Sequence, residues 1–419
     1  MSGRKRGRLS ASVLSFAMVM GFATLDVVRV AGAALASNPA LKGRTSDSAG
    51  GPEIFEGGCT AGERVTIAAV GDLLFHNRLQ RDALARRAGF TQFWQELVPV
   101  LKAADITYGN LEGPAAQGVA AGGRVVADPG WRVDQVVYGY KNQTLLFNFH
   151  PSVLTDLAHS GFDIVSTANN HALDRGAVGV DRTIDNLDAA GLAYVGTRKR
   201  EDAARSWSTR IKAGEATFAF LACTYSTNGM PDRHGQTQNC FRDRTALLDE
   251  IQALTRDPEV AGVIFTPHWG SENTHVPDRG QRSLGRAAIE AGALAVFGAH
   301  PHVLQPWEKH TTADGREGLI IYSLGNFISN QRQMPQRVGA VAIVEMVLGG
   351  DGKAAISAAG FVPTWVEIDA RGLRAVEAAE NSYAARLARR IYPAGNAIRA
   401  SDINSLPRTC GAVAAVEAR

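Results

Sequence analysis

Four histidines in this sequence follow short apolar segments of the kind that form buried strands: His171, His268, His300 and His302. Three residues with oxygen ligands occupy equivalent places: Asp72, Glu112 and Asn170. Imidazole nitrogens and carboxylate oxygens suit Zn²⁺, Mn²⁺ or Fe²⁺, and a carboxamide oxygen can add a neutral ligand. These side chains therefore predict a site for a divalent metal ion.

The sharpest local pattern is His300-Pro301-His302. On an extended segment, side chains two residues apart point the same way, because a strand alternates its faces with a period of two. Pro301 would stiffen such a segment. We therefore expect His300 and His302 to face one ion from one extended stretch of chain.

Each candidate also has a structural interpretation that needs no metal. Asp72 can cap a helix that follows it, and Glu112 can lie in a solvated turn. Asn170 can form an Asx-type turn with His171 as its partner, and His268 can pack in the core. Each alternative fits its own residue as well as the functional interpretation does. Five candidate residues that all follow strands for unrelated structural reasons would be a rarer coincidence than any single case, so together they favour a functional site.

The elements that must position these residues alternate along the chain. Strands are expected at 65–70, 105–108, 163–167, 263–266, 294–297, 319–323 and 338–348, with a hairpin at 208–211 and 217–222. Helices are expected at 151–160, 176–190, 244–255 and 280–291. This alternation predicts an α/β fold whose sheet faces are covered by helices. The carboxyl ends of strands in such folds converge on one crevice, so the polar residues should meet there.

The chain has 419 residues, 45% of them hydrophobic, and a net charge of +3 from 44 basic and 41 acidic residues. So small a surplus gives no case for nucleic-acid binding. Four basic residues at 4–8 precede an apolar run at 9–25. This pattern predicts a signal peptide over 1–36, with an uncleaved N-terminal membrane anchor as the alternative. We expect an exported protein that is periplasmic, on the cell surface or membrane-anchored, with a linker at 37–62.

Four cysteines are present: Cys59, Cys223, Cys240 and Cys410. An even number suits an oxidising compartment. No CxxC pair occurs, which argues against a thiolate zinc site. Cys59 and Cys410 flank the expected domain, and the other two flank a polar loop, so we expect pairs 59–410 and 223–240, although spacing alone does not fix connectivity. The sequence also has no GxSxG, no P-loop and no dinucleotide fingerprint, which disfavours serine and nucleotide-cofactor chemistry.

At the candidate residues the chain resembles the poly-γ-glutamate capsule-biosynthesis family known as CapA. The resemblance covers residues 65–350 in the expected order. The segments that carry it are Val70-Gly71-Asp72, Gly109-Asn110-Leu111-Glu112, Ala168-Asn169-Asn170-His171 with Asp174, His268-Trp269-Gly270 with Glu272, His300-Pro301-His302-Val303-Leu304-Gln305 and Tyr322-Ser323-Leu324-Gly325-Asn326-Phe327. It implies a four-layer α/β/β/α sandwich of the metallophosphoesterase type over 63–350, with 351–419 packing on the same domain.

The resemblance also implies residue roles. The implied metal ligands are Asp72, Glu112, Asn170, His268, His300 and His302. The implied catalytic residues are His171 and Asp174, and the implied substrate-binding residues are Asn110, Asn169, Arg175, Trp269, Glu272 and Asn326. Leu74 and Asn110 stand where phosphoesterases usually carry a histidine and a bridging aspartate. We therefore expect one or two ions of manganese, zinc or iron.

Two functions remain open at this point. One is an exported metal-dependent hydrolase that cleaves a phosphoester or an amide of an anionic polymer. The other is a non-catalytic partner that binds poly-γ-glutamate or its synthase complex on the same fold.

Overall fold

The computed structural model describes residues 52–407, apart from 142–143 and 371. The predicted signal peptide, the linker up to residue 51 and the pairing of Cys59 with Cys410 lie outside the described residues. Within the described part, no helix is both long and apolar enough to cross a membrane. The predicted domain boundaries stay predictions.

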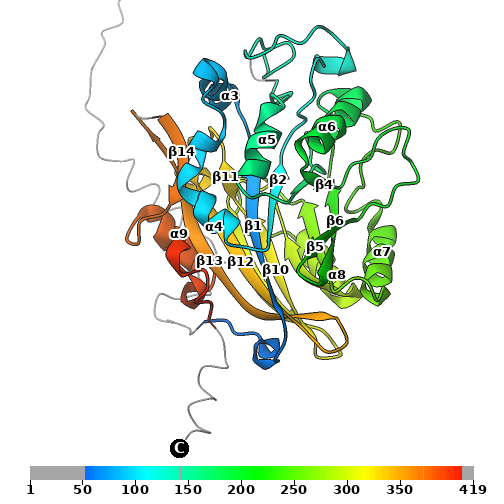
Figure 1. Ribbon diagram of the computed structural model, residues 1–419, viewed down its shortest axis with the longest axis vertical. Helices are drawn as coiled ribbons and strands as arrows, with labels where there is room; N and C mark the ends of the chain where they lie inside the picture. Colours follow the sequence, from blue (N-terminus) through cyan, green and yellow to red (C-terminus); the bar gives the residue numbers. More distant parts are fainter. Residues whose placement is uncertain (1–51, 142–143, 371, 408–419) are drawn as a thin grey trace, which may run out of the picture. The chain divides into compact units, whose positions relative to one another are not determined.

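The first sheet has eight strands in the order β14-β13-β12-β1-β2-β3-β4, with β11 paired to β1 (Figure 1). Its strands are β1 (Arg64–Leu73), β2 (Ile106–Leu111), β3 (Ile164–Ser166), β4 (Ala193–Val195), β11 (Asn326–Ile328), β12 (Val338–Leu348), β13 (Ala354–Asp369) and β14 (Gly372–Glu377). The strands β1 to β4 run parallel, whereas β12 to β14 are antiparallel to their neighbours. The carboxyl ends of β1, β2 and β3 therefore share one edge.

The second sheet has six strands in the order β5-β6-β7-β8-β10-β9. They are β5 (Thr209–Ala213), β6 (Ala216–Thr224), β7 (Gly262–His268), β8 (Ala293–Phe297), β9 (Leu304–Thr311) and β10 (Glu317–Leu324). Its four central strands are parallel, and an antiparallel strand closes each edge. The expected hairpin is confirmed as β5 and β6.

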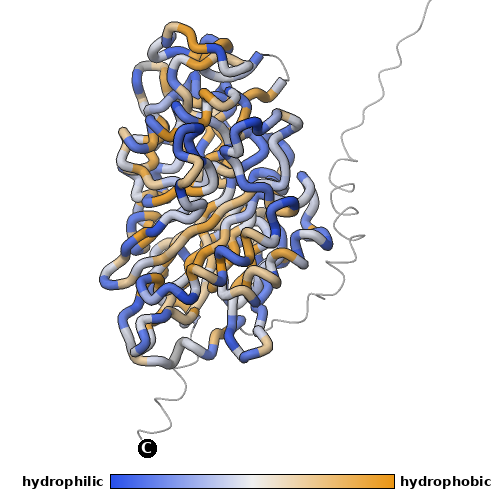
Figure 2. The backbone as a smooth tube through the Cα atoms, turned by 90° about the vertical axis from the view of Figure 1, so that its right-hand side faces the viewer, coloured by the Kyte–Doolittle hydropathy of each residue, from blue (hydrophilic) through white to orange (hydrophobic). Residues whose placement is uncertain are grey.

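Helices cover the outer faces of both sheets. They are α3 (Asn77–Leu84), α4 (Val98–Lys102), α5 (Ser152–His159) and α6 (Gly176–Ala190) on the first sheet, and α7 (Arg244–Arg256) and α8 (Arg279–Ala291) on the second. The helix α9 (Tyr383–Ile391) instead contacts strands of both sheets, β12 and β13 of the first and β9 of the second. Between the sheets, the ring of Tyr108 stacks on Phe220 and Phe297 at 6.1 and 6.2 Å. The strands in the interior consist largely of hydrophobic residues (Figure 2). The expected helix–sheet–sheet–helix layering is confirmed.

Three strands extend past their expected ends, and this matters for the site. Asp72 lies inside β1 and pairs in register with Asn110 of β2 and with Asn326 of β11. His268 is the last residue of β7 rather than the first residue of a loop. Backbone pairing continues through these polar residues, so they are held by sheet hydrogen bonds instead of by loops.

Candidate metal centre

Residues from both sheets meet at the carboxyl ends of β1, β2 and β7. The side chain of Asn110 makes the link: its Nδ2 donates to Asp72 Oδ1 at 2.8 Å and lies 3.2 Å from His268 Nδ1. All three side chains are at most 1% exposed. The convergence expected from the strand-end pattern is thus present across the two sheets.

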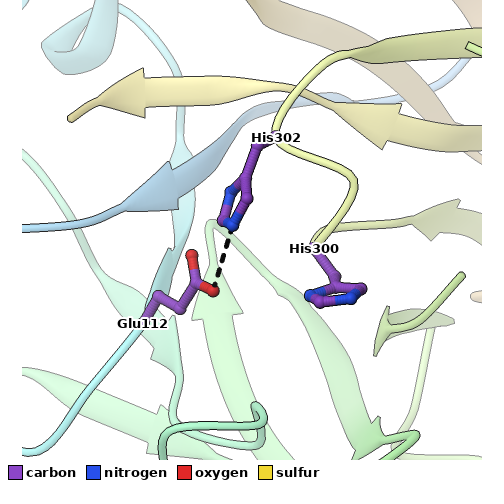
Figure 3. Close-up of side chains that lie close together, drawn as sticks. All are labelled: Glu112, His300 and His302. Carbon is purple, nitrogen blue, oxygen red and sulfur yellow. Dashed lines mark ion pairs between the residues drawn. The ribbon is translucent and has the colours of Figure 1, made fainter. Parts of the chain in front are cut away.

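The centre of this region is a buried group of three ligands (Figure 3). Glu112, His300 and His302 each place one ligand atom within 4.8 Å of the other two. Glu112 follows β2, and both histidines lie on the segment between β8 and β9. One Oε atom of Glu112 lies 3.7 Å from His302 Nε2. The distances suit side chains that surround one small cation.

The hydrogen-bond inventory tests whether a cation fits. Both carboxylate oxygens of Glu112 and Nδ1 of His300 are buried, and none has a hydrogen-bond partner among the residues that the structure describes. Oδ1 of Asn110 is also buried without a hydrogen-bond partner among the described residues. Burying polar atoms without partners is costly, and a buried carboxylate costs most of all. A divalent cation bound here would satisfy these lone pairs, so the donor set fits the predicted metal.

His302 is oriented by two acceptors behind it. Its Nδ1 lies 3.0 Å from Asp72 Oδ2 and 3.1 Å from Asn326 Oδ1. Since neither oxygen can donate, the network assigns a proton to Nδ1, and Nε2, which faces Glu112, is the nitrogen that a metal ion would bind in place of a proton. This is the arrangement that fixes a metal-binding histidine in many proteins.

His268 and Asn170 bind each other. Asn170 Oδ1 lies 3.0 Å from His268 Nε2, and Asn170 Nδ2 donates to Asn228 Oδ1 at 3.3 Å. His268 Nε2 is also 3.6 Å from Glu112 Oε1. With Asn110 donating toward Nδ1, His268 carries its proton on Nε2 here. The predicted ligands Asn170 and His268 therefore border the group of Glu112, His300 and His302, but their own ligand atoms are hydrogen-bonded to each other.

A histidine–aspartate pair lies beside this group. His171 Nδ1 is 2.8 Å from Asp174 Oδ2, which also accepts the backbone N–H of Phe147 at 2.6 Å. The ring of Phe147 packs edge-on against His171 at 4.7 Å. The His171 side chain keeps 11% of its surface exposed, against 1% for His268. This imidazole is therefore fixed in orientation and still reachable from solvent.

The expectation that His300 and His302 share an extended segment is wrong. Both residues have positive φ, 97° and 57°, so the chain bends sharply at each side of Pro301. Their rings are 5.9 Å apart and tilted by 58°. The backbone N–H of His300 lies 3.4 Å from Asp72 Oδ1, which ties the bend to β1. The two imidazoles reach one place because of this bend and not through strand alternation.

The charges of the cluster are strongly shifted by burial. Burial raises the pKa of Glu112 well above its usual value, and the nearby Asp72 carboxylate adds to this. Burial lowers the pKa of His268 well below its usual value and that of His300 to about 3. Burial opposes protonation of His302 too, but the Glu112 and Asp72 carboxylates outweigh it and raise its pKa to about 10. Neutral imidazoles at His268 and His300 are in the form that binds metals.

The predicted substrate-binding residues occupy different positions. Asn169 accepts the N–H of His171 and donates to Leu111 O at 2.7 Å, so it ties two strand ends together. Glu272 is exposed, and its charge acts on Glu112 and His302.

Arg175 and Trp269 have mainly structural partners. The guanidinium of Arg175 is buried and donates to the backbone carbonyls of Val137, Gly139, Leu146 and Asp174. Trp269 is buried against α8 and donates to Tyr322 O at 3.0 Å. These contacts give both residues supporting positions, and their contact with substrate stays a prediction.

Two neighbours of the site were missed at the sequence level. The ring of Tyr225 lies 4.5 Å from that of His300. Tyr225 directly follows β6, so the strand-end rule would have found it had the strand been extended to Thr224. Asn228, which contacts Asn170, has a positive φ of 52° and carries no such signal.

His76 is a third neighbour, and it lies two residues beyond Leu74, the position where phosphoesterases usually carry a histidine. Leu74 fills the expected position and is buried in the core of the first sheet. Burial lowers the pKa of His76 to about 4, and the charges of His302 and His171 lower it further. His76 therefore borders the cluster without belonging to the group of three.

Comparisons with known proteins show the family to which the chain belongs. The family described as bacterial capsule synthesis protein PGA_cap matches residues 66–331. Among relatives, the capsule biosynthesis protein CapA of Bacillus anthracis is 27% identical over 278 residues, 64% of this chain and 61% of that protein. The PGA biosynthesis protein CapA of Bacillus subtilis is 26% identical over 295 residues, covering 69% and 70% of the two chains. The chain thus spans about three fifths of the first relative's length.

Solved structures with a similar arrangement include a phosphatase from Mycoplasma pneumoniae, with a TM-score of 0.39, 13% identity and coverage of 74% of this chain and 96% of the other. The NAD nucleotidase of Haemophilus influenzae has a TM-score of 0.42 and 10% identity, and covers 76% and 54%. The family match spans more than half of the sequence and includes every residue of the buried ligand group. This chain belongs to the bacterial capsule synthesis family PGA_cap, which includes the CapA proteins.

Proposed function

We propose that this chain is a divalent-metal hydrolase of the cell envelope that cleaves a phosphoester or an amide bond in an anionic polymer, with poly-γ-glutamate as the leading substrate. The observation that carries the proposal is the buried group of Glu112, His300 and His302, whose ligand atoms lie within 4.8 Å of one another. Three of the group's buried polar atoms have no partner within the described ranges.

Glu112, His300 and His302 would hold the ion, which we expect to be zinc, manganese or iron. Asp72 and Asn326 would fix the tautomer of His302 from behind. When bound, such an ion lowers the pKa of a water toward neutrality and polarises a phosphoryl or carbonyl oxygen.

His171 supplies the proton transfer in this proposal. Asp174 accepts from its Nδ1 at 2.8 Å, so the free Nε2 is the atom that exchanges a proton with the leaving group. Phe147 packs against the ring and limits its rotation. Because His171 is partly exposed beside a buried group, it lies where substrate and cluster would meet.

We place this activity outside the cytoplasm. The predicted signal peptide or anchor supports export, and the disulfide between Cys223 and Cys240 suits an oxidising compartment. Two relatives are named for capsule or PGA biosynthesis, which supports an anionic capsule polymer or its synthase complex as the partner.

Metal content and turnover test the proposal together. The purified chain should hold one or two divalent ions by elemental mass spectrometry, and Glu112→Gln should lose them. Glu290→Gln is the matched control, because Glu290 is an exposed carboxylate paired with His310 at 2.8 Å. The loaded chain should hydrolyse at least one of a panel of phosphodiesters, phosphomonoesters and γ-glutamyl amides.

A chain that binds no ion after exposure to manganese and zinc would overturn the metal site. A chain that binds metal but hydrolyses nothing, and still binds polymer, would favour the non-catalytic partner role.

A further inference from the structure

His76 lies beside the candidate metal centre but has no role in the proposed function. It follows β1 by three residues and directly precedes α3. Two aromatic rings pack edge-on against its imidazole, Phe147 at 5.5 Å and Tyr140 at 6.3 Å. Asn77 ties this arrangement to α3, because its Nδ2 donates to Tyr140 O at 2.8 Å and its Oδ1 accepts from Tyr140 N at 3.0 Å. The ring of His76 is therefore held in a fixed position.

The phenyl ring of Phe147 connects His76 to the proton-transfer residue of the proposed function. The same ring packs edge-on against His171 at 4.7 Å, so the two imidazoles contact one phenyl group. Both His171 and His302 are close enough for their charges to lower the pKa of His76. His76 is partly exposed, as the His171 side chain is. A substrate that reaches His171 from solvent therefore comes within reach of His76 too.

The hydrogen bonds around His76 assign its proton to Nε2. Asn330 N lies 3.3 Å from Nδ1, and a backbone N–H can only donate, so Nδ1 must accept. Leu74 O is also 3.3 Å from Nδ1, but this carbonyl already accepts the backbone N–H of His76 at 3.1 Å. A proton on Nδ1 would leave the Asn330 N–H without an acceptor among the described residues. The assigned tautomer therefore has a lone pair on Nδ1 and a proton on Nε2.

The Nε2–H group of His76 is a hydrogen-bond donor that the fold does not use. This nitrogen has no hydrogen-bond partner in the described part of the chain, yet it is open to solvent, in contrast to Nδ1 of His300. Burial of the ring as a whole lowers the pKa of His76 to about 4, so near pH 7 the imidazole is neutral and carries this single N–H. A fixed donor of this kind beside a buried ligand group is suited to binding an oxygen of a substrate.

The cation predicted to meet an anionic substrate is engaged elsewhere. Arg175 is buried, and its guanidinium donates to four backbone carbonyls. His76 is thus better placed to donate to a substrate oxygen. A phosphoryl group and the tetrahedral state of an amide each carry more than one oxygen. One oxygen can accept from His76 while another faces the buried ligand group.

We propose that His76 is a further substrate-binding residue of this site, whose Nε2–H donates to an oxygen of a tetrahedral oxyanion, either a phosphoryl group or the tetrahedral state of an amide. His76 keeps its proton throughout, so it stabilises negative charge on the oxyanion while His171 exchanges a proton with the leaving group. That the oxyanion is hydrolysed rests on the proposed function, whereas the donor assignment rests on the contacts of His76 alone.

The tautomer is tested without metal and without turnover. In the full chain labelled with ¹⁵N-histidine, NMR correlations between ring nitrogens and ring protons distinguish the two neutral tautomers. The signals that disappear in His76→Gln should belong to a ring protonated at Nε2. A proton on Nδ1 of this ring would overturn the proposal, and this measurement decides it even where a variant fails to fold.

Binding of inorganic phosphate to the metal-loaded chain, measured by calorimetry, tests the contact with an oxyanion. His76→Phe keeps an aromatic ring in place and removes the donor, so it should weaken phosphate binding by about 10- to 100-fold, the effect of losing one hydrogen bond to a charged group. His76→Gln places an amide NH₂ near the position of Nε2 and should restore most of the affinity. His159→Phe is the control, because His159 is exposed at the end of α5.

The outcomes separate this proposal from the proposed function. Equal phosphate affinities in His76→Phe and His159→Phe would overturn the donor even in a chain that hydrolyses substrates, and so would a loaded chain that binds no phosphate. Weakened binding in a chain that hydrolyses nothing would keep the donor and overturn the hydrolase alone. Where there is turnover, His76→Phe should lower kcat by about 10²- to 10³-fold. A loss on phosphoesters alone would assign the oxyanion to a phosphoryl group, and a loss on γ-glutamyl amides alone would assign it to an amide.

Discussion

Asp72 and His302, 230 residues apart in the sequence, form the contact that orients the candidate metal centre. Asp72 Oδ2 lies 3.0 Å from His302 Nδ1, and Nε2 of the same ring lies 3.7 Å from Glu112 Oε1. Asp72 is buried inside β1, where sheet pairing on both sides fixes its backbone. The Asp72 carboxylate therefore holds the imidazole of His302, which lies on the segment after β8 of the second sheet, in a fixed position relative to the first sheet.

Replacing Asp72 tests this orienting role. Asp72→Asn keeps the shape of the side chain but removes the charge that fixes the proton on His302 Nδ1. We expect metal affinity to fall by about 10- to 100-fold, as for other partners behind a ligating histidine. Asp105→Asn is the control, because Asp105 accepts the N–H of Thr66 at the opposite end of β1. Competition with a fluorescent chelator measures both affinities, and equal values for the two variants would contradict the role.

The pair of His171 and Asp174 separates catalysis from metal binding. His171→Ala should lower kcat by about 10²- to 10⁴-fold, the usual contribution of one general acid or base. Metal content should stay at the level of the unaltered chain, because His171 is not in the group of three. His159→Ala, at the end of α5, is the control histidine. Loss of metal in His171→Ala would move His171 into the ligand set.

The sequence predicted those parts of the fold that depend on local patterns. Buried strands are short apolar runs, and the helix at 176–190 was found residue for residue because its apolar positions repeat with helical spacing. The strand-end rule then placed Asp72, Glu112 and His268 near one another. Each step uses only neighbours in the sequence and one general property of α/β sheets.

The remaining features depend on contacts between distant segments. The strand β11 has three residues and exists because Asn326 pairs with Asp72. The bend at His300 and His302 requires positive φ in two residues that rarely adopt it, and a hydrogen-bonding pattern across sheets holds it. The irregular segment before α5 is fixed by the buried Arg175, whose acceptors are all backbone carbonyls. No local sequence pattern predicts these contacts between distant residues.

The disulfide between Cys223 and Cys240, expected from their positions around a polar loop, holds that loop to the end of β6. The cysteines are 17 residues apart, so the bond should stabilise the fold by about 3 kcal/mol in the loop-entropy account. The double variant Cys223→Ala, Cys240→Ala should lower the free energy of unfolding by about that amount, measured by urea denaturation. Metal content should not change, because neither cysteine belongs to the group of Glu112, His300 and His302. An unchanged free energy of unfolding would contradict the stabilising role.

His275 should make the stability of the fold depend on pH. Burial lowers the pKa of this imidazole below its usual 6.5, and its Nδ1 lies 2.7 Å from Leu304 O. Above pH 6.5 the ring is neutral in both the folded and the unfolded chain, so its full stabilisation is present. Below pH 6.5 the unfolded chain takes up the proton first, and stability is lost until the folded pKa is reached, at no more than about 1.4 kcal/mol per pH unit. His275→Gln should therefore lose less melting temperature between pH 7.5 and 5 than the unaltered chain does. His234→Gln, at an exposed histidine, should keep the original slope, and equal slopes in the two variants would show that His275 does not cause the dependence.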